Sequence, residues 1–536
     1  MAGGVVVPVG SGGEQFGGRV TAFVILSSLV AASGGLLFGY DIGITGGVTN
    51  MDGFLEAFFP AVLENKQSAR ESSWCKFDSQ LLQLFTSSLF LAGIVGGLIA
   101  SFTTSRFGRV RTMLVGGVFF LLGAALTGGA VNIEMLVLGR VLLGLGVGSA
   151  NQAVPLYLSE MAPAQLRGAL NMMFQMATTL GIVAGQLINY GTAHLHPWGW
   201  RLSLALAAVP AAVLTAGGVF LPDTPNSLVE RGRHIRARHV LQRIRGAEVD
   251  VQAEFDEIRR ASDAAKAVKA PFLAIFRRKY RPELTWAILI PVFQQLTGIN
   301  AIMFYVTPLF QSLGFGDSAS LLTTVITGAV NVAATLLSIL TVDRVGRKAL
   351  FLAGGLQMLA AQVAIGALLG TTFASGTGGL SSGYATAVVV MICVYVAGFA
   401  WSWGPLGWLV PSEIQPLETR SAGQSITVAV NFAFTFAVGQ AFLSMLCHFK
   451  FGIFLFFAAW VVVMTLCVLL FLPETKGVHI DDMAAVWQRH WFWKRVVPAA
   501  AHERAHDSKG EQGGKGEGGS ADSSGGMEEK AVVSGV

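Results

Sequence analysis

The sequence predicts an all-α membrane protein with twelve transmembrane helices in two pseudo-symmetric six-helix halves, joined by short cytoplasmic linker helices. Three observations predict this class. Hydrophobic residues make up 53% of the 536 residues and charged residues only 13%, whereas a soluble domain carries roughly 25% charged residues. Apolar runs of the about 20 residues that cross a bilayer recur along the chain. Several motifs of the first half return in the second.

The apolar runs are helical by length, and they are continuous rather than alternating as in the strands of a membrane β-barrel. We expect the first run to act as the insertion signal, because residues 1–19 contain no apolar core followed by a cleavage site. The twelve predicted spans are 20–45, 79–101, 112–131, 135–157, 169–190, 201–221, 284–311, 319–341, 349–370, 385–409, 422–446 and 452–472.

Basic residues divide the connections between these spans into two classes. Every second connection carries Arg or Lys, whereas the others carry almost none, apart from a long loop at about 46–78 with balanced charges. The positive-inside rule places the basic connections, and with them both termini, in the cytoplasm. The basic residues of these connections are Arg106, Arg109, Arg111, Arg167, Arg344, Arg347, Lys348 and Arg420.

The chain therefore divides into five parts. The linker contains RGRHIRARHVLQRIRG, which is basic and amphipathic and indicates short cytoplasmic helices, with a plain solvated linker as the alternative. After about residue 498 the chain is rich in Gly, Ser, Glu and Lys, a composition typical of disorder. The parts are a cytoplasmic tail (1–19), the N-terminal half (20–221), the linker (222–283), the C-terminal half (284–472) and a cytoplasmic tail (473–536).

An internal repeat relates the two halves. Three pairs of motifs recur at offsets of 253, 238 and 251 residues: SEMAPAQLRG with SEIQPLETRS, SRFGR with DRVGR, and LPDT with LPET. Parallel repeats of this kind build one large class of transporters, in which the substrate binds near the midplane between the halves.

These motifs, together with FGYDIG (38–43), QQLTGIN (294–300) and LPETKG (472–477), resemble the sugar porter branch of the major facilitator superfamily over about residues 20–485. The combination is similar to plant-type monosaccharide/proton symporters. The resemblance implies import of hexoses such as glucose, together with protons, across the plasma membrane by alternating access. The chain departs from the superfamily pattern at Ser105, where Asp is usual, but its second copy keeps Asp343.

Asp41 is a carboxylate inside the first predicted span, where a charge costs roughly 2.5–3.5 kcal/mol on insertion scales. Arg140 is the only intramembrane charge of opposite sign in the N-terminal half. The resemblance implies that Asp41 is the protonation site and Arg140 its neighbour. Burial favours the neutral acid and a nearby guanidinium favours the anion, so moving Arg140 would switch proton binding. A static ion pair is the alternative, and spacing alone does not show whether the two meet.

Amide side chains gather in the predicted spans of the C-terminal half. An amide offers a donor and an acceptor at once, which suits a neutral polyhydroxyl ligand. The resemblance implies the same positions as sugar contacts, although a single amide could equally join two helices. The predicted sugar-binding residues are Gln175, Gln294, Gln295, Asn300, Asn331, Trp408 and Asn431, with Phe38 and Ile42 as apolar contacts beside Asp41. Gln294 and Gln295 lie about 100° apart on their helix, so one of them only grazes the ligand.

Charged residues at the cytoplasmic ends of the predicted spans form a candidate gate. Opposite charges there could lock the halves together while the cytoplasmic side is closed. Charges that only orient the protein in the membrane are the alternative. The predicted gate residues are Arg109, Glu160, Arg167, Arg347, Glu413 and Arg420.

The four cysteines divide by their predicted position. Cys75 and Cys447 fall in outer loops that face an oxidising space, and the resemblance implies that a disulfide joins them. Cys393 and Cys467 lie within predicted helices. GLGVGSA (144–150) resembles a dinucleotide loop, but it lies inside a predicted span with no strand before it.

We therefore expect a transporter rather than an enzyme, with monosaccharides, protons and the lipid bilayer as partners. The pattern indicates neither nucleic acid nor a metal, and no cofactor beyond the coupling proton. We expect a monomer. Two alternatives stay open: a passive sugar uniporter on the same fold, and a non-transporting sugar sensor.

Overall fold

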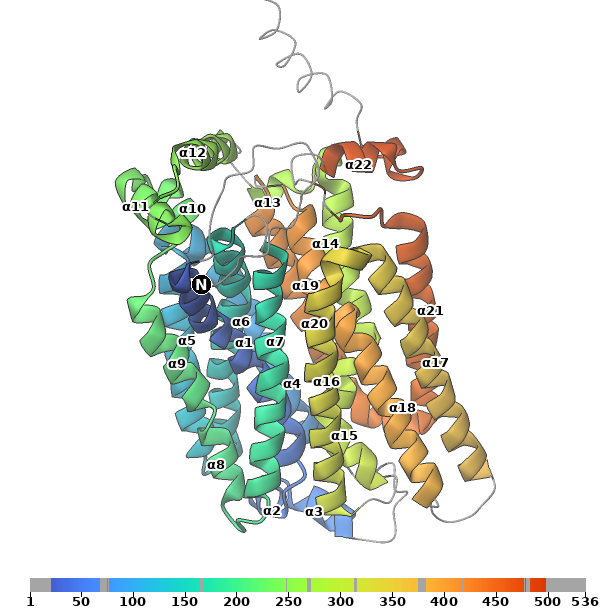
Figure 1. Ribbon diagram of the computed structural model, residues 1–536. Helices are drawn as coiled ribbons and strands as arrows, with labels where there is room; N and C mark the ends of the chain where they lie inside the picture. The colour runs from blue at the N-terminus through green and yellow to red at the C-terminus, as the bar shows by residue number, and fades with distance from the viewer. Residues whose placement is uncertain are drawn as a thin grey trace, which may run out of the picture.

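A computed structural model of the chain describes residues 21–67, 75, 77–163, 167–246, 248–267, 271–312, 316–374, 382–416, 418–476, 478 and 483–497. This part of the chain is helical and contains no β-strand. The predicted tail at 1–19 and the segment predicted to be disordered after 498 lie outside the described residues. Long helices run side by side in two groups, and short helices cap both ends of the bundle (Figure 1).

The N-terminal group contains five long helices and one span made of two shorter pieces. These helices are α1 (Ala22–Val48), α4 (Gln80–Phe107), α5 (Arg109–Gly128), α6 (Ile133–Met161), α7 (Arg167–Thr192), α8 (Gly199–Ala205) and α9 (Ala208–Phe220). Two short helices, α2 (Asp52–Phe58) and α3 (Pro60–Gln67), cover one end of the group.

The C-terminal group contains four long helices and two spans made of pairs of shorter helices. These are α14 (Arg281–Leu296), α15 (Ile299–Ser312), α16 (Asp317–Val345), α17 (Arg347–Ala374), α18 (Ser382–Trp401), α19 (Trp403–Ile414), α20 (Arg420–Phe449) and α21 (Gly452–Phe471).

Short helices cover the end of the bundle opposite α2 and α3 (Figure 1). The linker forms α10 (Pro225–Glu230), α11 (His234–Arg245), α12 (Gln252–Ala267) and α13 (Pro271–Ala274), followed by the 3₁₀ turn η2 (Arg278–Tyr280). The chain returns to this end with α22 (Met483–Arg489) and η4 (Trp493–Arg495). The predicted linker helices are thus present.

Ten helical segments of the described chain are long and apolar enough to cross a bilayer, and a bent pair, Arg278–Leu296 with Ile299–Tyr305, makes eleven. The predicted span at 169–190 forms α7, which has 26 residues but is not among these segments. This helix carries several amide side chains, including Gln175, Gln186 and Asn189. The multi-pass architecture is confirmed, whereas the count of twelve spans stays a prediction.

Glycines bring α1 and α7 into backbone contact. Gly35, Gly39 and Gly43 recur every four residues on α1, so they share one face of the helix. A Cβ atom on Gly39 would lie 1.8 Å from the carbonyl oxygen of Thr178 on α7. Small residues allow such close packing inside a membrane, and here they fix the helix that carries Asp41.

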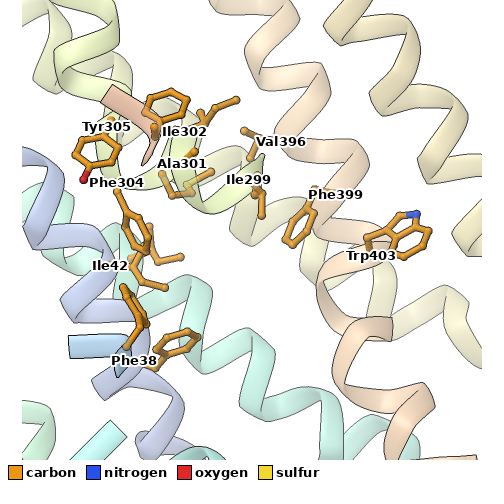
Figure 2. Close-up of a cluster of buried hydrophobic side chains, with 14 of the residues drawn as sticks. Phe38, Ile42, Ile299, Ala301, Ile302, Phe304, Tyr305, Val396, Phe399 and Trp403 are labelled. Atoms are coloured by element: carbon orange, nitrogen blue, oxygen red, sulfur yellow. The ribbon is translucent and has the colours of Figure 1, made fainter. Parts of the chain in front are cut away.

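The two groups meet along three seams. Helix α4 packs along α20, α7 along α16, and α1 against α15. Figure 2 shows the apolar core that crosses this boundary, with Phe38 and Ile42 of α1 beside Phe304 of α15. A ligand bound between the groups would therefore contact both.

Candidate functional site

The two intramembrane charges of the N-terminal group meet. Nη1 of Arg140, on α6, donates a hydrogen bond to Oδ1 of Asp41, on α1, and both side chains are buried. Nη2 of Arg140 donates to Oγ1 of Thr45 at 3.1 Å, and the Thr45 hydroxyl donates to the Asp41 carbonyl oxygen at 2.7 Å. Thr45 lies one turn beyond Asp41, so a single face of α1 holds the guanidinium.

An aromatic ring covers the face of the same guanidinium. The Arg140 Cζ atom lies 4.1 Å from the ring centroid of Phe85 on α4, a cation–π geometry. The Phe85 ring lies 5.1 Å from that of Phe54 on the short helix α2, and the Phe54 ring lies 5.7 Å from that of Trp200. A chain of rings thus connects α2 to the ion pair. The sequence gives no sign that Phe85 contacts Arg140, because Phe85 is one apolar residue among many in its helix.

The predicted amides of the C-terminal group form two pairs. Nε2 of Gln294 donates to the carbonyl oxygens of Trp403 and Gly404, both at 3.0 Å, and its Oε1 accepts from Nδ2 of Asn431 at 2.8 Å. Oε1 of Gln295 accepts from Nδ2 of Asn300 at 2.7 Å. Gln294 and Gln295 therefore point to different neighbours, as their helical spacing predicts.

Two helix breaks position these amides. Gly298, with φ +84°, separates α14 from α15, and Ser402 separates α18 from α19. Gln294 and Gln295 precede the first break, and Gln294 bonds to the backbone just after the second. Broken helices line the substrate site in several transporter families, because their free backbone groups can face a cavity.

Trp408, Phe38 and Ile42 lie at the boundary between the groups. The Trp408 ring, on α19, lies 6.1 Å from Phe174 of α7, and Phe174 directly precedes Gln175. The Phe38 ring lies 5.9 Å from Phe432 of α20. Phe38 thus contacts α20, the helix that also carries Asn431.

Gln175 and Asn331 lie on α7 and α16, two helices that pack together across the boundary. Neither side chain makes a hydrogen bond to another residue within the described ranges, although both are buried. Oδ1 of Asn431 is likewise buried and unpaired in that part of the chain. Buried amides are normally satisfied, so these atoms are available to a ligand.

Gln186 is a buried amide that the sequence reading missed. Both of its amide atoms lack a hydrogen-bond partner among the described residues. It lies 11 residues after Gln175, about three turns along α7 and on the same face. Its Oε1 lies against Gly328 of α16, where an added Cβ would be 2.1 Å away. The helical spacing from Gln175 is the signal that could have identified it.

The N-terminal gate residues form a network that includes the linker. Arg109 bonds Glu160 at 2.8 Å and Glu230 of α10 at 2.6 Å. Oε2 of Glu160 accepts a hydrogen bond from Thr224, and Oδ1 of Asp223 accepts from the backbone N–H of Arg109 at 3.1 Å. Asp223 and Thr224 of the LPDT motif are therefore part of this network, which lies at the start of α5.

The C-terminal copy repeats this arrangement. Arg347 bonds Glu413 at 2.8 Å and Asp343 at 3.0 Å, and its backbone N–H donates to Glu474 of LPET at 2.9 Å. Among the bonds between described residues, the first network joins the N-terminal half to the linker and the second joins the C-terminal half to the tail segment that contains Glu474. Arg420 is the first residue of α20. The side chain of Arg167 lies outside the described part of the structure. The gate role stays a prediction.

The predicted disulfide is present. Cys75 and Cys447 are bonded, with their Cα atoms 4.6 Å apart and 372 residues between them. Oγ of Ser87 on α4 donates to Oε1 of Gln440 on α20 at 2.7 Å. The disulfide therefore lies at one end of the contact between α4 and α20. Cys393 and Cys467 are free.

Comparison with known proteins identifies a family. Residues 27–487 match the family model described as "Sugar (and other) transporter". The chain is 60% identical to sugar transport protein MST3 of Oryza sativa subsp. japonica, over 93% of this chain and 96% of that protein. It is 56% identical to sugar transport protein 10 of Arabidopsis thaliana, over 95% of this chain and 99% of that protein.

Solved structures show the same fold. The proton:xylose symporter XylE bound to 6-bromo-6-deoxy-D-glucose matches with a TM-score of 0.74 and 27% identity, over 88% of this chain and 100% of that one. XylE from E. coli in a partially occluded inward open conformation matches with a TM-score of 0.69 and 27% identity, over 85% and 100% of the two chains.

Proposed function

Because the chain belongs to the sugar (and other) transporter family, we propose that it imports monosaccharides such as glucose together with protons, by alternating access. Its relatives are named sugar transport proteins, and XylE is named a proton:xylose symporter. The observation that carries the proton part is the buried contact between Asp41 and Arg140. An ionisable pair inside a membrane protein marks a functional site by default.

Asp41 would bind the proton from the outer side. A neutral Asp41 no longer holds Arg140 by charge, so protonation would leave the guanidinium held only by Thr45 and Phe85. Loss of the proton would restore the ion pair. The chain's own residues thus provide two arrangements that differ by one proton, which is what coupling requires.

The sugar would bind between Gln175 of the N-terminal half and the amides at the two helix breaks. Unpaired amide atoms of Asn331 and Asn431 support this placement, because sugar hydroxyls can both donate and accept hydrogen bonds. Trp408 would pack against an apolar face of the ring. Phe38 and Ile42 flank Asp41 on α1, so the same helix would contact the sugar and bind the proton.

We propose a monomer in the plasma membrane with both termini in the cytoplasm and no cofactor beyond the coupling proton. The start of α1 and the helix α22 lie at the same end of the bundle as the basic linker (Figure 1). That arrangement supports the proposed orientation through the positive-inside rule. Transport requires no covalent step, so we propose no enzymatic activity.

Uptake of a panel of radiolabelled monosaccharides, with and without an uncoupler, tests this proposal. We expect hexoses to accumulate above their outside concentration, and the uncoupler to abolish the accumulation. Uptake that only equilibrates, with no effect of the uncoupler, would instead support a passive uniporter. A complete lack of flux through the purified protein would support a sugar sensor.

A further inference from the structure

The segment PFLAIFRRKYR (residues 271–281) presents apolar side chains outward at the linker end of the bundle. Phe272, Leu273 and Phe276 are 46%, 74% and 62% exposed. None of them belongs to the proposed sugar or proton site. Such a cluster is unusual on a surface that faces only water, and it marks a contact with another apolar partner or a membrane.

The opposite face of this segment packs against the bundle, which keeps Phe272, Leu273 and Phe276 directed outward. Ala274, Ile275 and Tyr280 are buried and pack together with Leu284 of α14 and Ile426 of α20. The segment is therefore docked on the ends of two helices of the C-terminal half. Its exposed apolar side chains lie beside the start of α14, where a spanning segment leaves the apolar core of the bilayer.

Basic side chains border the apolar ones. Arg277 and Arg281 are exposed, and neither has a side-chain partner within the described residues. Arg278 instead binds the end of the described chain: its Nε donates to the Val496 carbonyl oxygen at 2.9 Å and its Nη2 to that of Arg495 at 3.1 Å. These bonds bring two further exposed basic residues, Lys494 and Arg495, to the same surface.

An exposed tryptophan marks the level of this surface relative to the bilayer. Trp491 is 52% exposed, and its indole Nε1 donates to the Leu470 carbonyl oxygen in the last turn of α21 at 2.9 Å. Tryptophan is enriched where a spanning helix meets the lipid headgroups. The basic residues that follow it are therefore at headgroup level.

We propose that this basic and apolar surface, formed by residues 272–281 and 491–495, binds the headgroups of anionic phospholipids in the cytoplasmic leaflet. Arg277, Lys494 and Arg495 would contact the phosphate groups, while Phe272, Leu273, Phe276 and Trp491 enter the region between headgroups and acyl chains. Charge complementarity selects anionic over neutral lipid. The exposed Phe and Leu favour a lipid over a soluble anion, which would leave them in water.

Thermal unfolding of the purified full-length protein in detergent tests this inference. We expect added phosphatidylserine to raise the Tm more than phosphatidylcholine does. The variant R277Q/K494Q/R495Q should lose that difference, whereas the control R233Q/R236Q/R238Q, which removes three exposed charges from the linker, should keep it. Arg278 is left intact because it holds the two segments together.

Lipid adducts counted by native mass spectrometry give a second readout that does not depend on the Tm of a variant. We expect phosphatidylserine adducts to persist on the wild type and the control, and to decrease in R277Q/K494Q/R495Q. F272S/L273S/F276S should retain fewer adducts of both lipids. Equal effects of the two lipids on the wild type, or full retention of phosphatidylserine by the charge variant, would overturn the inference.

Discussion

Arg140 is held from three directions: by the carboxylate of Asp41, by the hydroxyl of Thr45 and by the ring of Phe85. The sequence identified both charges, since a charge in an apolar run is conspicuous. It did not show that they meet, because the relative depth of α1 and α6 depends on packing between helices. Phe85 and Phe54 could not be identified, because apolar residues are the rule in such spans.

Replacing Phe85 with Leu should extend sugar uptake to higher pH. The change removes the cation–π contact but keeps an apolar side chain, so Arg140 would hold the Asp41 anion less firmly. Such a contact is worth about 0.5–2 kcal/mol, or up to about 1.5 pH units at 1.36 kcal/mol per unit. The pH profile of uptake measures the effect. Phe120→Leu, which changes a buried ring on α5, should leave the pH profile of uptake unchanged. An equal shift of the profile in Phe120→Leu would contradict the account.

Replacing Gln295 with Ala should raise the KM for sugar. The amide pairs with the half-buried Asn300, so its removal leaves that side chain without this partner and deletes a proposed sugar contact. The expected loss is about 1–3 kcal/mol, which raises KM by roughly one to two orders of magnitude. Gln357→Ala on α17, whose amide bonds Trp401 and Val394, is the matched control. Unaltered sugar affinity in Gln295→Ala would remove this residue from the site.

At the scale of helices, the breaks within spans were not predicted. The runs at 284–311 and 385–409 are apolar on average and carry no charged residue, so hydropathy gives one continuous helix for each. The structure divides them at Gly298 and Ser402, and these divisions place Gln294 against the backbone of α19. Glycine can adopt the positive φ of such a break at little cost, but it gives no hydropathy signal.

Replacing Gly298 with Ala should therefore lower the Tm and impair uptake. Its φ of +84° is strained for Ala, and the new Cβ would lie 2.7 Å from the ring of Phe457. Strain of this kind costs about 1–3 kcal/mol. Gly452→Ala is the control, because no atom lies within 4 Å of a Cβ at that position. Thermal unfolding of both variants tests whether Gly298 is needed at the break. Equal Tm values would show that the break does not require glycine.

For the whole molecule, the repeated loop motifs predicted the two copies of the charged network. They did not predict that the linker and the C-terminal tail take part, with Asp223 and Glu474 accepting from the backbone N–H groups of Arg109 and Arg347. Neutral hydrogen bonds join the halves directly at this end: Nδ2 of Asn171 donates to Oγ of Ser412 at 3.1 Å, and the hydroxyls of Ser101 and Ser421 lie 3.3 Å apart.

The Cys75–Cys447 disulfide joins the two halves covalently at the opposite end of the bundle. Cys447→Ser should lower the Tm, since a disulfide commonly contributes about 2–4 kcal/mol. Cys467→Ser, at a free cysteine, is the control. The difference between the two Tm values should disappear in a reducing agent, which breaks the bond in the control. A persistent difference would mean that the serine acts by another route.

The central claim is that Asp41 couples sugar to protons, and sugar-driven acidification of a proteoliposome lumen tests it most directly. Glucose added outside should acidify the lumen in the wild type and in the control Asp263→Asn, which alters an exposed linker carboxylate. Asp41→Asn should abolish acidification and concentrative uptake while still exchanging labelled for unlabelled glucose. Acidification by Asp41→Asn at the wild-type rate would contradict the account.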